Sequence, residues 1–194
     1  MTNLLAEIDA LVARLPATVQ QALDRVTSRQ TFARGDYLLR QGDVCRYTYF
    51  IETGLARKYY LVDGREITTE FYFSQDLALS MTSYTIQVPS QEFIQALENT
   101  TALRTDYRAF QALKTQFPVL MELDLRLTEY YALWQEERLR QFRTLDATQR
   151  YERLLRTQSQ WVQHLQLTHI ASYLGVSIET LSRIRAKLAS TNRI

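Results

Sequence analysis

Several side chains near the C-terminus could recognise nucleic-acid bases and phosphates. Arg183 has the paired donors that bind O6 and N7 of guanine, and Glu179 could accept a hydrogen bond from cytosine or orient Arg183. Ile178 lacks polar groups but could contact the methyl group of thymine. Hydroxyl, imidazole and cationic groups around them are candidates for the remaining DNA contacts, chiefly to phosphates: Thr168, His169, Ser177, Thr180, Ser182, Arg185 and Lys187.

The spacing around these residues is typical of a helix-turn-helix, whose second helix enters the major groove of DNA. Gly175 lies where the chain must reverse, because glycine adopts positive φ readily, and Ser177 can cap the second helix. Apolar residues at helical spacing would pack the two helices together: Ile170, Ala171 and Leu174 on the first, and Leu181, Ile184 and Leu188 on the second. An ordinary helical hairpin is the alternative interpretation.

The charge distribution favours DNA binding over a simple hairpin. The chain of 194 residues has a formal net charge of +2. From Arg138 to the end, however, there are ten Lys and Arg against three Asp and Glu, a net charge of +7, whereas residues 1–137 have a net charge of −5. A basic segment attached to an acidic body is typical of a protein that binds nucleic acid.

The composition argues against several other classes of protein. No apolar run is long enough to span a membrane and no secretory leader is evident, so we expect a cytoplasmic protein without a membrane partner. The single cysteine, Cys45, excludes an internal disulfide and a cluster held by several thiolates. His164 and His169 lack ligand spacing, so we expect no metal and no cofactor. Without a phosphate loop or a nucleophile motif, an enzyme is not expected.

Short strand candidates separated by Gly and Asp turns dominate the segment from Gln30 to Arg104. The clearest are aromatic and β-branched, and Asp63-Gly64 is typical of a tight hairpin turn. At least seven short strands predict a small antiparallel barrel or roll. The best-defined candidates span residues 47–52, 55–61, 66–73, 93–97 and 102–104.

Helices are expected on both sides of this roll. Residues 3–27 predict short helices broken at Pro16, Asp106 can cap another helix, and Pro118 begins or kinks a long one. The long helix has a stripe that we expect to form a dimer interface: Leu120, Leu123, Leu127, Tyr130 and Trp134. It also carries apolar residues elsewhere: Met121, Leu125, Leu133, Leu139 and Phe142. Burial within one chain is the alternative, but two DNA readers on a symmetric site favour a dimer.

The order of these elements resembles the Crp/Fnr (catabolite activator) family of bacterial transcription regulators. In the roll the resemblance rests on residues 35–43, 49–54 and 63–65, and in the DNA-binding part on residues 176–184. It implies an α+β fold with a cyclic-nucleotide-binding-like antiparallel β-roll, a dimerisation helix and a helix-turn-helix. We expect an N-terminal sensor domain over residues 1–117, the dimerisation helix over 118–143 and the DNA-binding domain over 144–194.

The segment 76–91, which corresponds to the family's phosphate cassette, departs from the family pattern. Leu79-Ser80 stands where a cyclic-nucleotide binder has Gly-Glu, and Pro89-Ser90 stands where it has Arg-Ser or Arg-Thr. No Lys or Arg occurs between Arg65 and Arg104, and a buried phosphate without a cation is costly. Backbone amides at a helix N-terminus are the remaining way to bind an anion. We therefore predict that the roll does not bind cAMP, and place a different effector pocket at Tyr72, Leu79, Ser80, Pro89 and Ser90.

Two further departures concern the DNA-binding part. The chain ends six residues after Leu188, too few for the β-hairpin wing that family members usually have. Either the protein lacks a wing or the sequence is a piece of a longer one. Ile178 also stands where the family often has Arg as the first base-reading residue.

The sequence therefore predicts a dimeric, sequence-specific DNA-binding transcription regulator. The expected partners are double-stranded DNA, a second copy of the chain, RNA polymerase and an unidentified small-molecule effector. The alternative is a small-molecule-binding or protein-interaction module with a vestigial helix-turn-helix.

Overall fold

The computed structural model describes residues 2–191, which form two compact units. The first contains Met1–Tyr59 and Glu70–Gln135, and the second contains Tyr60–Thr69 and Glu136–Ile194. The tip of one hairpin thus clusters with the C-terminal helices. No helix among the described residues is long and apolar enough to cross a membrane.

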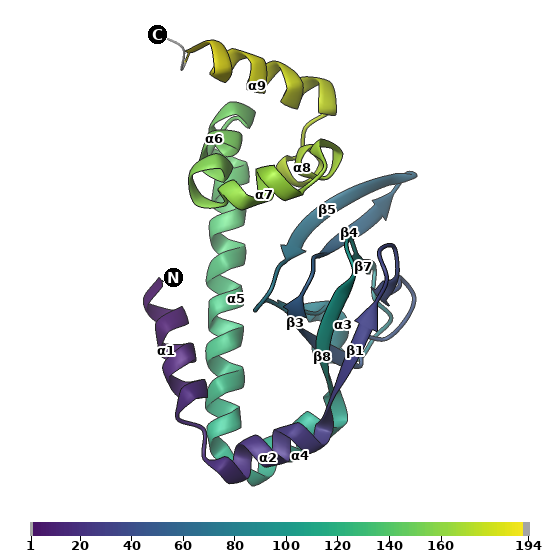
Figure 1. Ribbon diagram of the computed structural model, residues 1–194, viewed down its shortest axis with the longest axis vertical. Coiled ribbons are helices and arrows are strands. Elements are labelled where there is room, and N and C mark those ends of the chain that lie inside the picture. Colours follow the sequence, from purple (N-terminus) through teal and green to yellow (C-terminus); the bar gives the residue numbers. More distant parts are fainter. Residues whose placement is uncertain (1, 192–194) are drawn as a thin grey trace. The chain divides into compact units, whose positions relative to one another are not determined.

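Two antiparallel four-stranded sheets form the roll expected from the sequence (Figure 1). The first has the order β1-β8-β3-β6, with bounds Thr27–Phe32, Thr100–Asp106, Tyr47–Thr53 and Leu77–Ala78. The second has the order β2-β7-β4-β5, with bounds Tyr37–Leu39, Glu92–Ala96, Ala56–Val62 and Arg65–Tyr72. The five best-defined strand candidates begin and end within two residues of the ends predicted from the sequence. The short strands β2 and β6 have the weakest pattern in the sequence.

The core of the roll is filled by inward-facing residues of both sheets. Ile51, Ile94 and Ala102 expose none of their surface. Gly54 follows β3 with φ +98°, and a Cβ atom there would lie 2.6 Å from Thr100 Oγ1 and from the carbonyl oxygen of Asn99. Only glycine fits this close approach.

Helices flank the roll in the sequence. The first unit contains α1 (Thr2–Ala13), α2 (Ala17–Val26), α3 (Met81–Ile86) and α4 (Tyr107–Gln116), together with most of α5 (Pro118–Thr144). Asp106 Oδ1 accepts a hydrogen bond of 2.9 Å from the amide of Ala109, which confirms the predicted cap of α4. The break at Pro16 and the start of α5 at Pro118 are also confirmed.

The packing of α5 corrects the predicted dimer face. Leu120 and Leu123 are 0% and 9% exposed within their own chain, where they pack against Ile8 and Val19 of α1 and α2 (Figure 1). Leu127 and Tyr130 adjoin the same core, and Trp134 stacks on Tyr131 with ring centroids 6.0 Å apart. The prediction that Leu120 and Leu123 face a second copy is therefore wrong, because the N-terminal helices already cover these two positions.

The second unit holds the C-terminal helices α6 (Ala147–Thr157), α7 (Ser159–His164), α8 (Leu167–Leu174) and α9 (Ile178–Thr191). Asp146 and Gln149 form a capping box at the start of α6. The hairpin tip is joined to α8 through Ser172, whose hydroxyl accepts from the amide of Thr68 at 2.8 Å and donates to the carbonyl of Glu66 at 2.7 Å. Because α9 continues to Thr191, the first residues after Leu188 are helical, and residues 192–194 lie outside the described part of the chain.

Candidate nucleic-acid interface and sensor site

The turn between α8 and α9 has the geometry that the sequence predicts. Gly175 has φ +68° and ψ +38°, the left-handed conformation that glycine favours. Its amide donates to the carbonyl of Ser172 at 3.1 Å, and the amide of Val176 donates to that of Ala171 at 3.0 Å. These two bonds are a Schellman motif and satisfy carbonyls at the end of α8. A Cβ atom on Gly175 would lie 3.1 Å from the ring of Phe142.

The start of α9 is capped as predicted, and its inner face is buried. Ser177 Oγ accepts from the amide of Thr180 at 3.2 Å. Leu181 and Ile184 are 0% and 8% exposed, while Leu188 is half-buried. The hydrogen bond from Ser177 lowers the pKa of Glu179, so this carboxylate is charged at neutral pH.

The outer face of α9 carries most of the residues predicted to contact DNA. Ile178, Glu179, Ser182, Arg183, Arg185 and Lys187 are exposed, and Ile178 keeps 38% of its surface open to solvent. Ser177 is exposed and Thr180 is half-buried at the start of the helix, while Thr168 is exposed and His169 half-buried on α8. The structure thus brings these side chains together on two adjacent helices, and their contacts with DNA stay predictions.

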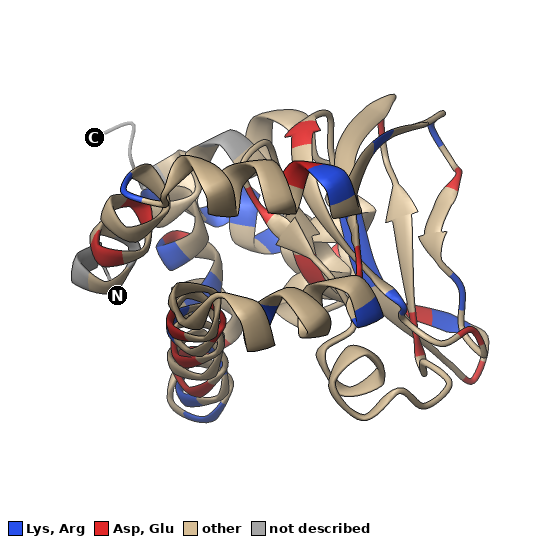
Figure 2. Ribbon diagram, turned by 90° about the horizontal axis from the view of Figure 1, so that it is seen from below, with Lys and Arg blue, Asp and Glu red and all other residues tan. Residues whose placement is uncertain are grey.

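Several arginines of the basic segment are engaged within the second unit. Arg138 donates to the carbonyl of Tyr173 at 3.1 Å, and Arg150 donates to that of Leu174 at 3.2 Å. Both satisfy the C-terminal end of α8, where a cation is favoured. Arg140 and Arg153 pair with Glu137. Figure 2 shows both signs of charge along α5. The net charge of +7 therefore includes arginines that make contacts within this unit, whereas Arg183, Arg185 and Lys187 of α9 are exposed.

Four of the five residues predicted to form an effector pocket are buried in the roll. The Tyr72 hydroxyl lies 3.4 Å from the carbonyl of Leu79, and Ser90 Oγ donates to Ser80 Oγ at 3.2 Å. Pro89 is exposed and pairs with Val44 in an isolated β-bridge. The structure therefore brings Tyr72, Leu79, Ser80 and Ser90 into one polar interior and leaves Pro89 at its edge.

A buried charge cluster, which we call the Lys58 cluster (Lys58, Glu70 and Glu92), lies among these residues and was not predicted. Lys58 Nζ on β4 lies 2.6 Å from Glu70 Oε1 on β5 and 3.5 Å from Glu92 Oε1 on β7. The Ser80 hydroxyl donates to Glu92. The roll thus contains a buried cation, Lys58. It comes from β4, which precedes the segment between Arg65 and Arg104 that has no Lys or Arg. The signal in the sequence that could have predicted this cluster is the position of Lys58 within an aromatic and apolar strand.

Two side chains of α5 extend the Lys58 cluster. The Tyr131 hydroxyl donates to Glu70 Oε1 at 3.0 Å and lies 3.3 Å from Lys58 Nζ, and Gln135 Nε2 donates to the same hydroxyl at 2.6 Å. Burial alone would lower the pKa of Lys58, but Tyr72, Glu70 and Glu92 outweigh it and hold this pKa well above its ordinary value. Burial, followed by the charge of Glu70, raises the pKa of Tyr131. Lys58 is therefore charged and Tyr131 is neutral at physiological pH.

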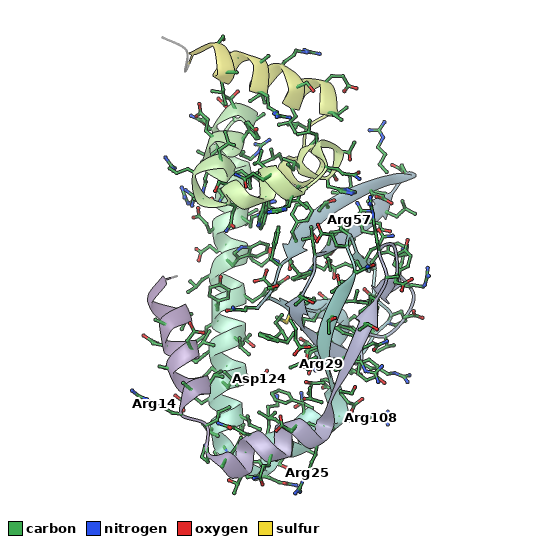
Figure 3. The ribbon with its side chains drawn as sticks, in the orientation of Figure 1. Arg14, Arg25, Arg29, Arg57, Arg108 and Asp124 are labelled. Carbon is green, nitrogen blue, oxygen red and sulfur yellow. The ribbon has the colours of Figure 1, made fainter. Side chains whose placement is uncertain are left out.

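The neighbour of Lys58 on β4 lies in a different environment. Because successive side chains of a strand alternate between its faces, Arg57 lies on the face of β4 opposite Lys58. Figure 3 labels Arg57. Its guanidinium carbon lies 4.3 Å from the centre of the Tyr59 ring, and it donates to Gln95 Oε1 at 3.1 Å. The two adjacent cations of β4, Arg57 and Lys58, thus lie on opposite faces of the sheet.

A cavity of about 390 Å³ lies elsewhere in the roll, lined by Leu38 and Leu39 of β2 and by residues of the segment 43–49. None of the five predicted pocket residues lines it. Cys45, which does, is 2% exposed, and burial raises the pKa of its thiol. A buried thiol with a raised pKa is poorly reactive. The described residues contain no group of three His, Cys, Asp or Glu side chains that could hold a metal ion.

The chain thus combines an antiparallel roll, a long helix and a capped helix-turn-helix. The model of the family described as "Cyclic nucleotide-binding domain" matches residues 29–117. The transcriptional activator protein Anr of Pseudomonas protegens is 26% identical over 177 residues, which cover 84% of this chain and 71% of that protein. The fumarate and nitrate reduction regulatory protein of Vibrio cholerae is 26% identical over 187 residues, which cover 88% and 74%.

The solved structures agree with this fold. FixK2 from Bradyrhizobium japonicum superposes with a TM-score of 0.70 at 18% identity, covering 86% of each chain. The fold, the family match and the relatives make the chain similar to regulators of the Crp/Fnr family. By their names, these two relatives are a transcriptional activator and a regulatory protein of fumarate and nitrate reduction.

Proposed function

We propose that this chain is a transcription regulator of the Crp/Fnr family that binds DNA as a homodimer, reads bases through α9 and does not bind a cyclic nucleotide in its roll. The observation that carries the proposal is the outer face of α9. Ile178, Glu179 and Arg183 are exposed there on a helix whose start is capped and whose inner face is buried. A rigid helix with exposed base-reading side chains suits the major groove.

A second copy of the chain fits an apolar face of α5 that its own chain leaves open. Met121, Leu125 and Leu139 are 59%, 56% and 53% exposed. With the intervening positions they follow alternating steps of four and three residues, the seam of a two-stranded coiled coil. The seam is Met121, Leu125, Thr128, Ala132, Gln135, Leu139 and Phe142, all of them exposed. This face replaces the Leu120–Leu123 stripe as the proposed interface.

The Lys58 cluster argues against a cyclic nucleotide in the roll. The ammonium that could attract a phosphate is already paired with Glu70 and lies near Glu92. A phosphate entering this interior would meet two carboxylates for one cation in a medium of low dielectric. Calorimetry with millimolar cAMP or cGMP should show no saturable heat, and a micromolar dissociation constant would overturn this part of the proposal.

Selection of duplexes from a random pool tests DNA reading directly. A dimer should enrich an inverted repeat whose half-sites lie about one helical turn apart. Failure to enrich any sequence would favour the interaction module with a vestigial helix-turn-helix. RNA polymerase and a small-molecule effector stay predictions from the sequence, as do the three domain ranges.

A further inference from the structure

The predicted effector site of the roll is filled by charged groups of the chain itself. Lys58, Glu70 and Glu92 come from three different strands and are 1%, 6% and 7% exposed. Lys58 lies between the two carboxylates, while Ser80 of the predicted site donates to Glu92. The chain thus supplies here both a cation and its anionic partners.

Glu70 connects this cluster to helix α5. Its Oε2 accepts from the Tyr72 hydroxyl at 2.6 Å, while its Oε1 lies 2.6 Å from Lys58 Nζ and 3.0 Å from the Tyr131 hydroxyl. One carboxylate therefore joins β4, β5 and α5. Hydrogen bonds to a charged group are stronger than those between neutral groups, and a dry interior strengthens them further.

The geometry of this contact is more restrictive than apolar packing. Apolar side chains tolerate small shifts of a helix, whereas the Tyr131 hydroxyl must stay within hydrogen-bond distance of Glu70 and Gln135. A buried ion pair adds little net stability compared with apolar residues of the same size. Its effect here is to select one position of α5 against the strands of the roll.

We propose that the Lys58–Glu70–Tyr131 contact substitutes for an effector: it fixes α5 against the roll and keeps the protein competent for DNA binding without a small molecule. The inference rests on the proposed function, because DNA binding is its output. Tyr131 is a positioning residue in this role, since it acts on DNA only through α5.

The test compares two single substitutions at adjacent positions of α5. Tyr131→Phe removes only the hydroxyl that meets Glu70. Tyr130→Phe is the matched control, because Tyr130 is half-buried on the same helix and its hydroxyl makes no hydrogen bond among residues 2–191. In the free protein, Tyr131→Phe should speed amide hydrogen exchange over residues 127–135 about tenfold, the loss expected for a hydrogen bond to a charged group. It should also weaken binding to the selected duplex by about fivefold. Equal effects of the two substitutions on exchange and on DNA affinity would overturn the proposal.

A refolding experiment tests independence from small molecules. Protein unfolded in guanidinium and refolded in ligand-free buffer should bind the selected duplex with unchanged affinity. Lost affinity that returns only after a small-molecule extract of cells is added would overturn the inference. If native protein selects no duplex at all, the proposed function fails, and the exchange comparison still decides whether Tyr131 holds α5.

Discussion

Lys58 Nζ and Glu70 Oε1 lie 2.6 Å apart in the interior of the roll, with side chains only 2% and 7% exposed. Breaking such a pair leaves an uncompensated buried charge. Lys58→Met should therefore lower the free energy of unfolding by about 3–5 kcal/mol, measured by urea denaturation. The double variant Lys58→Met/Glu70→Gln should recover part of this loss, because it removes one stranded carboxylate.

A surface pair provides the control for the Lys58 prediction. Arg29 and Glu52 also lie 2.6 Å apart, but the Arg29 side chain is 67% exposed. Arg29→Met should change the free energy of unfolding by at most about 1 kcal/mol. Similar losses from both substitutions would contradict the view that burial sets the energy of the Lys58 pair.

Arg183 should read sequence, whereas Lys187 should mainly supply charge. Arg183→Ala should cost about 1–3 kcal/mol on the selected duplex and little on a scrambled one, because it removes a contact to base edges. Lys187→Ala should weaken both duplexes nearly equally and reduce the salt dependence by about one phosphate contact. Salt titrations of each variant on both duplexes measure the difference. Equal weakening by Arg183→Ala on both would contradict the assignment of α9 as the base reader.

The two apolar faces of α5 should respond differently to charge. Leu125→Glu/Leu139→Glu changes exposed positions, so it should give folded monomers in sedimentation and abolish binding to an inverted repeat. Leu120→Glu buries an unpaired carboxylate instead and should cost several kcal/mol of stability, seen in denaturant unfolding. A dimer unchanged by the double substitution would place the interface elsewhere.

The lowered pKa of Glu137 predicts that the stability of the second unit depends on pH. Hydrogen bonds from Arg140 and Gln141 lower the pKa of Glu137 from 4.5 to about 2. A lowered carboxyl pKa adds stability that is complete above the unfolded value and is lost as pH falls through the folded value. Wild type and Glu137→Gln should differ by about 1 kcal/mol at pH 7, since the Arg140 side chain of this pair is 55% exposed. The difference should shrink between pH 4.5 and 2 in urea denaturation series. A difference that stays constant over this range would contradict the assignment.

Features set by neighbours in the chain could be predicted from the sequence. Asp106, Asp146 and Gly175 act on backbone groups within a few residues, so their roles follow from local patterns. The Lys58 cluster could not be predicted in this way, because its members meet only through strand pairing and α5 packing. The prediction of the dimer face was wrong for a related reason. Two stripes of α5 are apolar at similar spacing, and only the packing of α1 and α2 shows which stripe the chain itself covers.

The turn between α8 and α9 restricts how this protein can vary over evolutionary time. Gly175 is held by a left-handed backbone, φ +68°, and by the ring of Phe142, 3.1 Å from where a Cβ atom would lie. A smaller residue at position 142 would make room for a side chain but leave the backbone strained. If the backbone relaxed instead, a side chain at position 175 would still meet the ring of Phe142. No single substitution therefore opens a route away from glycine, and a lineage that changed this turn would pass through a variant with a disturbed start of α9.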